Sequence, residues 1–356
     1  MTVHDPILAA AQRARAAIPD DTAMLRAAAE LARDYALANP RIYWTDLLAS
    51  ALVGWSALAG AILVDNVAIA LACGLVSMLA LYRAASFIHE LTHVRKGALP
   101  GFRLGWNLLV GLPLMIPSFM YEGVHTQHHA RTRYGTADDP EYLPLALMKP
   151  WSLPLFILVA ALAPIGLILR FGLLTPLSLL IPALRRKVVA EFSALSINPA
   201  YRRRAPEGDF ARQWAAQEAG ACVVALALVG SVFAFGWTPL LVYMAVHSAM
   251  TVINQLRTLV AHLWENEGEA MTVTAQYLDS VNVPPPGTLP ALWAPVGLRY
   301  HALHHLLPSV PYHALGKAHA RLMDTLDMDS PYRKGNYAGM MPLVGKIARS
   351  TMTRGA

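Results

Sequence analysis

The sequence predicts an all-α integral membrane protein, in which two transmembrane hairpins carry a helical cap on the cytoplasmic side. Composition is the first observation behind this prediction: hydrophobic residues make up 55% of the 356 residues and charged residues 15%, whereas soluble domains carry about 25% charge. The second is a pair of long apolar stretches, each broken once by turn residues. The third is a set of short histidine groups close to the ends of these stretches, which the cap would hold.

Charge and cysteine content exclude several classes of protein. The chain has 29 Lys and Arg against 23 Asp and Glu, a net charge of +6. In so apolar a chain, this surplus indicates basic cytoplasmic loops and contact with anionic lipid headgroups, and not a nucleic-acid partner. Cys73 and Cys222 are the only cysteines, which excludes a disulfide scaffold and a cysteine-ligated zinc or iron–sulfur site.

Residues 1–41 are predicted to form two amphipathic helices ahead of a membrane-embedded domain at residues 42–356. Asp5-Pro6 and Asp20-Asp21-Thr22 are typical of helix starts, and Asn39-Pro40 is typical of a helix stop. No apolar core of a signal peptide occurs within the first forty positions.

The length of the apolar stretches predicts four spans, because a spanning helix needs about 20 mostly apolar residues. Residues 47–64 and 67–88 flank a tight break at Asp65-Asn66. Residues 219–256 are uncharged and too long for one span, and Gly236-Trp237-Thr238-Pro239 divides them into a second hairpin.

Two further apolar stretches are ambiguous, and they leave two more spans possible beyond the four. Residues 104–121 contain Pro113 and Pro117. If the histidine groups on either side of this stretch share a site, it cannot cross and must be re-entrant or interfacial, which prolines permit where protein covers the backbone. Residues 152–184 contain Arg170 and four prolines. By the same reasoning the number of crossings between histidine groups must be even, so this stretch crosses twice or not at all.

An even number of crossings places three basic segments on one side of the membrane, at residues 95–96, 185–187 and 202–204. The positive-inside rule makes that side cytoplasmic. We therefore expect a bacterial inner-membrane protein whose active site faces the cytoplasm.

Nine of the thirteen histidines fall in four groups along the chain. The groups are His89 and His93; His125, His128 and His129; His262; and His301, His304 and His305. Spacings of three and four residues put imidazoles on one face of a helix, as convergence on a metal requires. Packing so many ionisable rings together has no stabilising effect unless a cation binds their lone pairs. Because zinc takes four ligands and octahedral metals take six, nine nitrogens imply two metal ions.

One short motif favours a different class of enzyme. His89-Glu90-Leu91-Thr92-His93 matches the His-Glu-x-x-His pattern of zinc proteases, in which the glutamate is the general base. An intramembrane zinc protease would need a third ligand, and it leaves the other seven histidines unexplained. All-nitrogen sites with open positions suit iron and dioxygen chemistry better than hydrolysis.

The three boxes His-x-x-x-His, His-x-x-His-His and His-x-x-His-His, in this order around membrane hairpins, resemble the membrane-bound fatty acid desaturase and hydroxylase superfamily of di-iron oxidases. Asp-Asp-Pro-Glu at 138–141, Leu-Leu-Pro-Ser-Val-Pro after the third box and the run from Arg257 to His262 also match, and the resemblance covers roughly residues 45–325. It implies that the nine histidines ligate two irons, with Asn254 as a partner through water. The chain departs from the family at Thr258, where members that hold this water carry asparagine.

The resemblance also implies an activity in which two iron ions and dioxygen oxidise a fatty acid or fatty acyl substrate. Desaturation is the expected outcome. Oxidative decarboxylation of a free fatty acid to a terminal alkene and acyl hydroxylation are the alternatives, because all three begin with hydrogen abstraction.

Several residues near the boxes are candidates for supporting roles in this chemistry. The candidate catalytic residues are Glu122, Asp138 and Arg257. Further carboxylates that can orient imidazoles are Glu90, Asp139, Glu265 and Asp279, and aromatic residues that can line a substrate tunnel are Trp106, Phe119, Tyr121 and Trp293. Arg257 can hold a carboxylate near the metals, or form a structural bridge to Glu265 or Asp279, which we favour.

Electrons must come from another protein. The sequence has no fused haem domain with a His-Pro-Gly-Gly motif, no flavin fingerprint and no ferredoxin cysteines. We therefore expect an external donor such as ferredoxin with its reductase, which the arginine-rich loops can dock.

Overall fold

Helices form the regular structure of the described residues, which are 17–95, 97–145 and 148–352 of a computed structural model. No β-strand occurs in these ranges, where only isolated bridges such as that of His262 with Ser280 are found. The predicted all-α fold class is therefore confirmed. The helices are α2 (Thr22–Tyr35), α3 (Pro40–Leu63), α4 (Val67–His93), α5 (Phe102–Trp106), η1 (Asn107–Gly111), η2 (Ser118–Met120), α6 (His125–His128), α7 (Ser152–Ile168), η4 (Leu169–Leu174), α8 (Thr175–Leu180), α9 (Pro182–Glu191), α10 (Gly208–Phe235), α11 (Thr238–Leu259), α12 (Val273–Asp279), α13 (Pro290–Trp293), α14 (His301–Leu306), α15 (Tyr312–Thr325), α16 (Pro331–Lys334) and α17 (Met340–Met352).

The N-terminal region contains one of the two predicted amphipathic helices. Helix α2 begins where expected, because the Asp21 side chain accepts a hydrogen bond from the Met24 amide at 2.8 Å and caps the first turn. The helix predicted at Asp5-Pro6 lies outside the described residues. The predicted stop at Asn39-Pro40 is wrong: α2 already ends at Tyr35, and Asn39 caps the start of α3 with Pro40 in its first turn.

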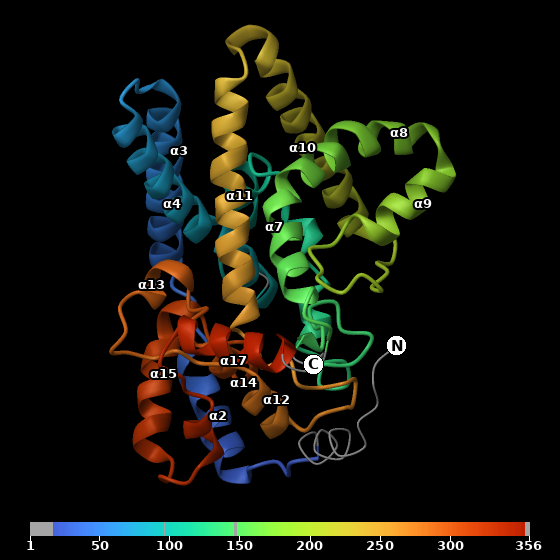
Figure 1. The fold of residues 1–356 in the computed structure, drawn as a ribbon. Coiled ribbons are helices and arrows are strands. Elements are labelled where there is room, and N and C mark those ends of the chain that lie inside the picture. Colours follow the sequence, from blue (N-terminus) through green and yellow to red (C-terminus); the bar gives the residue numbers. More distant parts are fainter. Residues whose placement is uncertain (1–16, 96, 146–147, 353–356) are drawn as a thin grey trace.

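Both predicted hairpins are present. Helices α3 and α4 pack along each other, and the Asn66 side chain caps α4 by accepting a hydrogen bond from the Ile69 amide at 3.1 Å. Helices α10 and α11 are joined at Gly236, whose φ of +74° is a conformation that favours glycine. Figure 1 shows these helices standing upright, with α11 between α4 and α7.

Four helices in the described part of the chain are long and apolar enough to cross a membrane: α3, α4, α10 and the continuous stretch Ser152–Leu180. The number agrees with the prediction, but α11 is not among them, because polar residues such as Asn254 and Arg257 lie near its end. Its 22 residues still extend about 33 Å, and α11 leads the chain from the tip of α10 back to the cap (Figure 1). Outward-facing apolar side chains such as Phe233, which is 93% exposed, suit a lipid environment.

Residues 104–121 fold back on themselves, as the even number of crossings predicted. Helices α5 and η1 lead inward, and the chain returns to η2. The buried Asn107 side chain joins the two arms, because it accepts a hydrogen bond from the Ser118 amide at 2.8 Å and donates one to the Ser118 hydroxyl at 2.9 Å. The two arms therefore meet, as expected of a stretch that is re-entrant or interfacial.

Residues 152–191 also return to the side from which they start. Helix α7 rises beside α11, α8 turns sideways and α9 descends (Figure 1). The loop after α9 then reaches the region of the second histidine box, where the Leu195 amide donates to the Met120 carbonyl at 2.8 Å.

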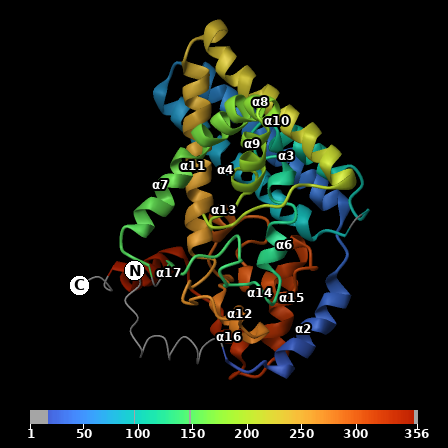
Figure 2. The same cartoon turned by 90° about the vertical axis from the view of Figure 1, so that its right-hand side faces the viewer.

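The cap comprises α2 and α12 to α17. Figure 2 shows α2 and α15 side by side at one edge of it, and Met24 of α2 belongs to the same apolar cluster as Leu315 and Leu322 of α15. The third histidine box lies on α14, between this cluster and the upright helices.

Candidate metal centre

The nine clustered histidines meet as two groups of ring nitrogens where the upright helices join the cap. One group contains His89, His93, His125, His129 and His304, and the other contains His128, His262, His301 and His305. Within each group the candidate ligand atoms all lie within 4.8 Å of one another. Each His-x-x-His-His box therefore contributes to both groups.

Local structure explains why these rings come together. His89 and His93 occupy the last two turns of α4, one turn apart. Helix α6 carries the second box and α14 the third, and in such short helices ring positions i, i+3 and i+4 share one face. His262 comes from the chain just after α11, where it pairs with Ser280 in an isolated bridge.

The distances between ring nitrogens fit the binding of several histidines to one metal ion. The Nε2 atoms of His125 and His129 are 2.9 Å apart, those of His262 and His301 are 2.9 Å apart, and those of His301 and His305 are 3.1 Å apart. Two nitrogens bound at right angles to one ion, each at about 2.1 Å, are about 3.0 Å apart. The spacing thus matches coordination, and five and four nitrogens leave octahedral positions open on both ions.

Burial favours the neutral form that binds metals in imidazoles such as His125 and His301. It holds the pKa of His125 and of His301 well below the usual value, and the neighbouring rings lower both further. Among the described residues, the buried Nδ1 atoms of His301 and His304 and both buried ring nitrogens of His89 have no hydrogen-bond partner. A cluster of neutral, partly unpaired donors fits two divalent transition metals.

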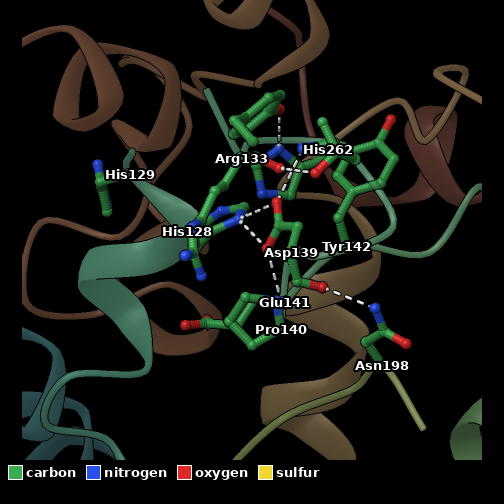
Figure 3. A network of polar contacts seen from close by, with 12 residues as sticks. His128, His129, Arg133, Asp139, Pro140, Glu141, Tyr142, Asn198 and His262 are labelled. Atoms are coloured by element: carbon green, nitrogen blue, oxygen red, sulfur yellow. Dashed lines mark hydrogen bonds and ion pairs between the residues drawn. The ribbon is translucent and has the colours of Figure 1, made fainter. Parts of the chain in front are cut away.

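A carboxylate holds His128 in place. His128 Nδ1 lies 3.0 and 2.9 Å from the two carboxylate oxygens of Asp139, and both residues are buried (Figure 3). The Asp139 carboxylate also accepts from the Gly135 and Glu141 amides, at 2.8 Å each, which fixes its orientation. Burial alone would lower the pKa of His128, but Asp139 raises it above the usual value.

The predicted candidate Asp138 does not reach the rings. Its side chain is exposed, whereas Asp139, which was also predicted to orient an imidazole, contacts His128 directly. Adjacent aspartates alternate in direction here because the chain turns at Pro140, and the Asp139 carbonyl is held by the Asn198 side chain at 2.9 Å (Figure 3).

Glu141 and Tyr121 form a second such support, although the sequence analysis gave Glu141 no role of its own and expected Tyr121 to line a substrate tunnel. Glu141 Oε1 lies 2.8 Å from His125 Nδ1, and the Tyr121 hydroxyl donates to Glu141 Oε2 at 2.7 Å. Burial raises the pKa of Glu141 to about 7. The available signal was the position of Glu141 in the Asp-Asp-Pro-Glu run.

His262 is supported through a tyrosine. The Tyr134 hydroxyl lies 2.8 Å from His262 Nδ1 and donates to Asp279 Oδ2 at 2.9 Å. Tyr142 donates to the same carboxylate oxygen at 3.0 Å. Asp279 was a predicted partner, but it acts through Tyr134, which nothing in the sequence distinguishes from other tyrosines.

Two other predicted carboxylates make contacts of another kind. Glu122 forms an ion pair with Arg103, and no hydrogen bond to a histidine is found for it among the described residues. Glu90 is buried and accepts hydrogen bonds from the Tyr43 hydroxyl and, at 3.1 Å, from the Tyr312 amide. Its Oε1 lies 3.8 Å from His89 Nδ1, beyond hydrogen-bond distance.

Arg257 lies beside the four-histidine group. It borders a small cavity together with His301, and its guanidinium donates to Asn254 Oδ1 at 3.0 Å. The predicted tunnel residue Trp293 borders the same cavity. Trp106 and Phe119, in contrast, are fully buried in the apolar core between the helices.

Comparison with known proteins agrees with this centre. The sequence matches the fatty acid desaturase family over residues 65–336. It is similar to a ceramide hydroxylase of Caulobacter vibrioides (strain NA1000 / CB15N), with 48% identity over 339 residues that cover 94% of this chain and 96% of that protein. No solved structure matches the chain significantly.

These findings decide between the two readings of the first histidine box. A zinc protease would use Glu90 as a free base, yet Glu90 is held by Tyr43 and Tyr312 and seven further histidines surround the site. The protease alternative is therefore wrong. The chain belongs to the fatty acid desaturase and hydroxylase family and is a membrane oxidoreductase.

Proposed function

We propose that this protein is a di-iron lipid hydroxylase that uses dioxygen to hydroxylate a ceramide. The observation that carries the proposal is the similarity to the ceramide hydroxylase, which at 48% identity extends over nearly the whole of both chains. It therefore includes the cap and the membrane helices, which surround the substrate, as well as the histidine boxes. Family membership alone supports oxidation of a lipid without fixing the product.

The nine histidines would hold two irons, in one group of five and one of four. When bound, these ions supply the reduction of dioxygen and the oxidation of an unactivated C–H bond. The chain fixes the rings through their second nitrogen: Asp139 holds His128, Glu141 holds His125 and Tyr134 holds His262. Such contacts set which nitrogen carries the proton and keep the other free for the metal.

Hydroxylation has a defined balance of atoms and electrons. One oxygen atom of dioxygen enters the C–H bond, and the other leaves as water after taking up two electrons and two protons. Because the sequence contains no flavin, haem or ferredoxin motif of its own, we infer an external donor. Ferredoxin with its reductase is the donor class that we propose.

Desaturation is the second candidate, because the family name describes it and both reactions begin at a C–H bond. The sequence alone favoured desaturation, whereas the similarity to a hydroxylase favours hydroxylation. Neither comparison supports the decarboxylation alternative.

We also propose that the histidine side faces the cytoplasm of a bacterial inner membrane. The basic segments at 185–187 and 202–204 lie toward the same end as the second histidine box, since the Arg203 guanidinium donates to the Glu122 carbonyl at 2.6 Å. Basic loops favour the cytoplasmic side.

Mass spectrometry of reconstituted protein tests the proposed reaction. Purified protein is supplied with a ceramide, ¹⁸O₂, reductant, ferredoxin and ferredoxin reductase. Hydroxylation predicts a ceramide that gains one ¹⁸O atom, and desaturation predicts one that loses two hydrogens without label. The variant His301→Ala is the negative control, because it removes a nitrogen from the four-histidine group. Conversion of free fatty acids but not of ceramide would contradict the proposed substrate.

A further inference from the structure

Arg257 is a partly buried cation beside the candidate metal centre. It lies in the last turn of α11, and its buried Nε atom has no hydrogen-bond partner among the described residues. The groups recorded in contact with it in the described part of the chain are neutral: the Asn254 amide oxygen at 3.0 Å and the Tyr82 hydroxyl. A buried charged donor left unsatisfied is costly, so its site suits an oxygen acceptor from outside the chain.

The cavity next to Arg257 has the character of a lipid site. Most of its wall is apolar and includes Val260, Val283 and Trp293, and His301 of the four-histidine group forms part of the same wall. Its volume is about 10 Å³, close to the space that a single water molecule needs. As it stands it can take one polar atom of a ligand, such as an acyl oxygen, and not a complete lipid.

A second arginine borders the cavity but is held by carbonyl groups of its wall. Arg299 donates to the Val283 carbonyl at 2.8 Å and to the Gly287 carbonyl at 2.9 Å, and it lies over the Tyr300 ring. These contacts tie Arg299 to the wall. Arg257, whose buried Nε atom has no acceptor among the described residues, is thus the better placed of the two to bind an acceptor from a ligand.

We propose that Arg257 binds the oxygen at the first carbon of the substrate's acyl chain, and that this contact places the oxidised carbon within the first few carbons of that chain. The inference rests on the proposed function, because it names the part of the lipid that enters first. Arg257 and His301 border one small cavity, so an acyl oxygen held by Arg257 leaves only a few bonds to the metal group. The acceptor chemistry is common to the amide carbonyl of a ceramide and the carboxylate of a free fatty acid.

Equilibrium binding separates this contact from general lipid binding. The iron-loaded protein is kept without reductant, so no turnover occurs. It is offered a short-chain ceramide, a free fatty acid of the same chain length, and an ether analogue in which –O–CH₂– replaces the amide group. Because a hydrogen bond to a charged group is strong, the wild-type protein should bind the ceramide about 10-fold or more tighter than the ether.

The variants make the assignment specific. Arg257→Met should abolish the preference for the amide, and Arg257→Lys should restore part of it, because a cation is present again. Arg299→Gln should keep the ratio between amide and ether whatever happens to overall affinity. Iron content close to that of the wild type shows that each variant is folded at the centre. An unchanged ratio in Arg257→Met would overturn the proposal.

Product position gives a second and independent readout. Fragmentation of the hydroxylated ceramide should place the hydroxyl of the wild-type product near the acyl carbonyl, and Arg257→Met should spread it along the chain. A single, unchanged position in this variant would also refute the role of Arg257. If the fatty acid shows the Arg257-dependent preference and the ceramide does not, the oxygen is a free carboxylate. If no lipid is converted while the binding preference holds, the proposed reaction fails and the Arg257 contact stands.

Discussion

His128 and Asp139 form a buried pair in which the ring nitrogen Nδ1 faces both carboxylate oxygens, at 3.0 and 2.9 Å. Asp139 is 0% exposed and is itself fixed by the Gly135 and Glu141 amides. The pair therefore sets the direction in which His128 presents Nε2 to the four-histidine group.

Asp139→Asn should weaken metal binding at that group. The asparagine side chain is neutral and has one acceptor oxygen, where the Asp139 carboxylate has two charged ones. Loss of such a contact to a metal-binding histidine typically lowers metal affinity or activity 10- to 100-fold. We expect iron per chain to fall from about two toward about one, with hydroxylation or desaturation reduced at least 10-fold. Metal analysis of purified protein and product quantification measure both effects.

The neighbouring residue supplies a matched control for this variant. Asp138→Asn makes the same chemical change one position earlier, at an exposed side chain that does not contact the rings. Iron content and turnover should stay within about twofold of the wild type, as for most exposed substitutions. Equal effects of the two variants would contradict the assigned role of Asp139 and favour Asp138, the residue selected from the sequence.

Tyr134→Phe should affect His262 in a similar way. The hydroxyl links His262 Nδ1 to Asp279, at 2.8 and 2.9 Å, while the Ser280 hydroxyl makes a longer contact with the same ring nitrogen at 3.3 Å. Removing the Tyr134 hydroxyl leaves the ring with this weaker contact and the buried carboxylate with one donor fewer, so we expect about a 10-fold loss of activity. Tyr142→Phe is the comparison, because the Tyr142 hydroxyl donates to Asp279 at 3.0 Å, whereas its ring, which the variant keeps, packs edge-on against His262. The expectation fails if Tyr142→Phe loses more iron than Tyr134→Phe.

Glu90→Gln tests the structural role assigned to the first box. The Gln side chain keeps an oxygen for the Tyr312 amide, but its contact with the Tyr43 hydroxyl changes from charged to neutral. We expect a loss of stability on the order of 1–3 kcal/mol, seen as a lower midpoint in thermal unfolding, while iron stays bound. Tyr43→Phe removes the other side of this contact and should produce a shift in the same direction. Complete loss of iron in Glu90→Gln would instead make Glu90 part of the metal centre.

The sequence was sufficient to predict much of the fold. Hairpins could be predicted because length and apolarity define a span, and tight breaks such as Asp65-Asn66 separate the arms. The fold-back at 104–121 followed from the even number of crossings. Asn39-Pro40 was predicted to end a helix, but it begins one, since the same two residues suit the end of one helix and the cap of the next.

The site was predictable only in part, for a physical reason. Histidine spacing shows which rings share a helix face, and the structure brings all nine together. The partners of these rings come from turns and from distant segments, so spacing carries no information about them. Tyr134 and Asp279 are 145 residues apart, and the choice between Asp138 and Asp139 depends on the backbone turn at Pro140.

The last prediction concerns which end of the molecule faces the cytoplasm. Single cysteines at exposed positions, Asp65→Cys, Pro100→Cys and Trp237→Cys, are introduced into a background in which Cys73 and Cys222 are replaced by alanine. Positions 65 and 237 lie at the tips of the two hairpins, and position 100 follows α4 near the histidines. A membrane-impermeant maleimide should therefore label 65 and 237 in intact spheroplasts and label 100 only in inverted vesicles, because basic loops favour the cytoplasm. Labelling of 100 together with 65 from the same side would contradict both the hairpin formed by α3 and α4 and the shared metal centre, whereas full inversion of all three would change only the assigned side.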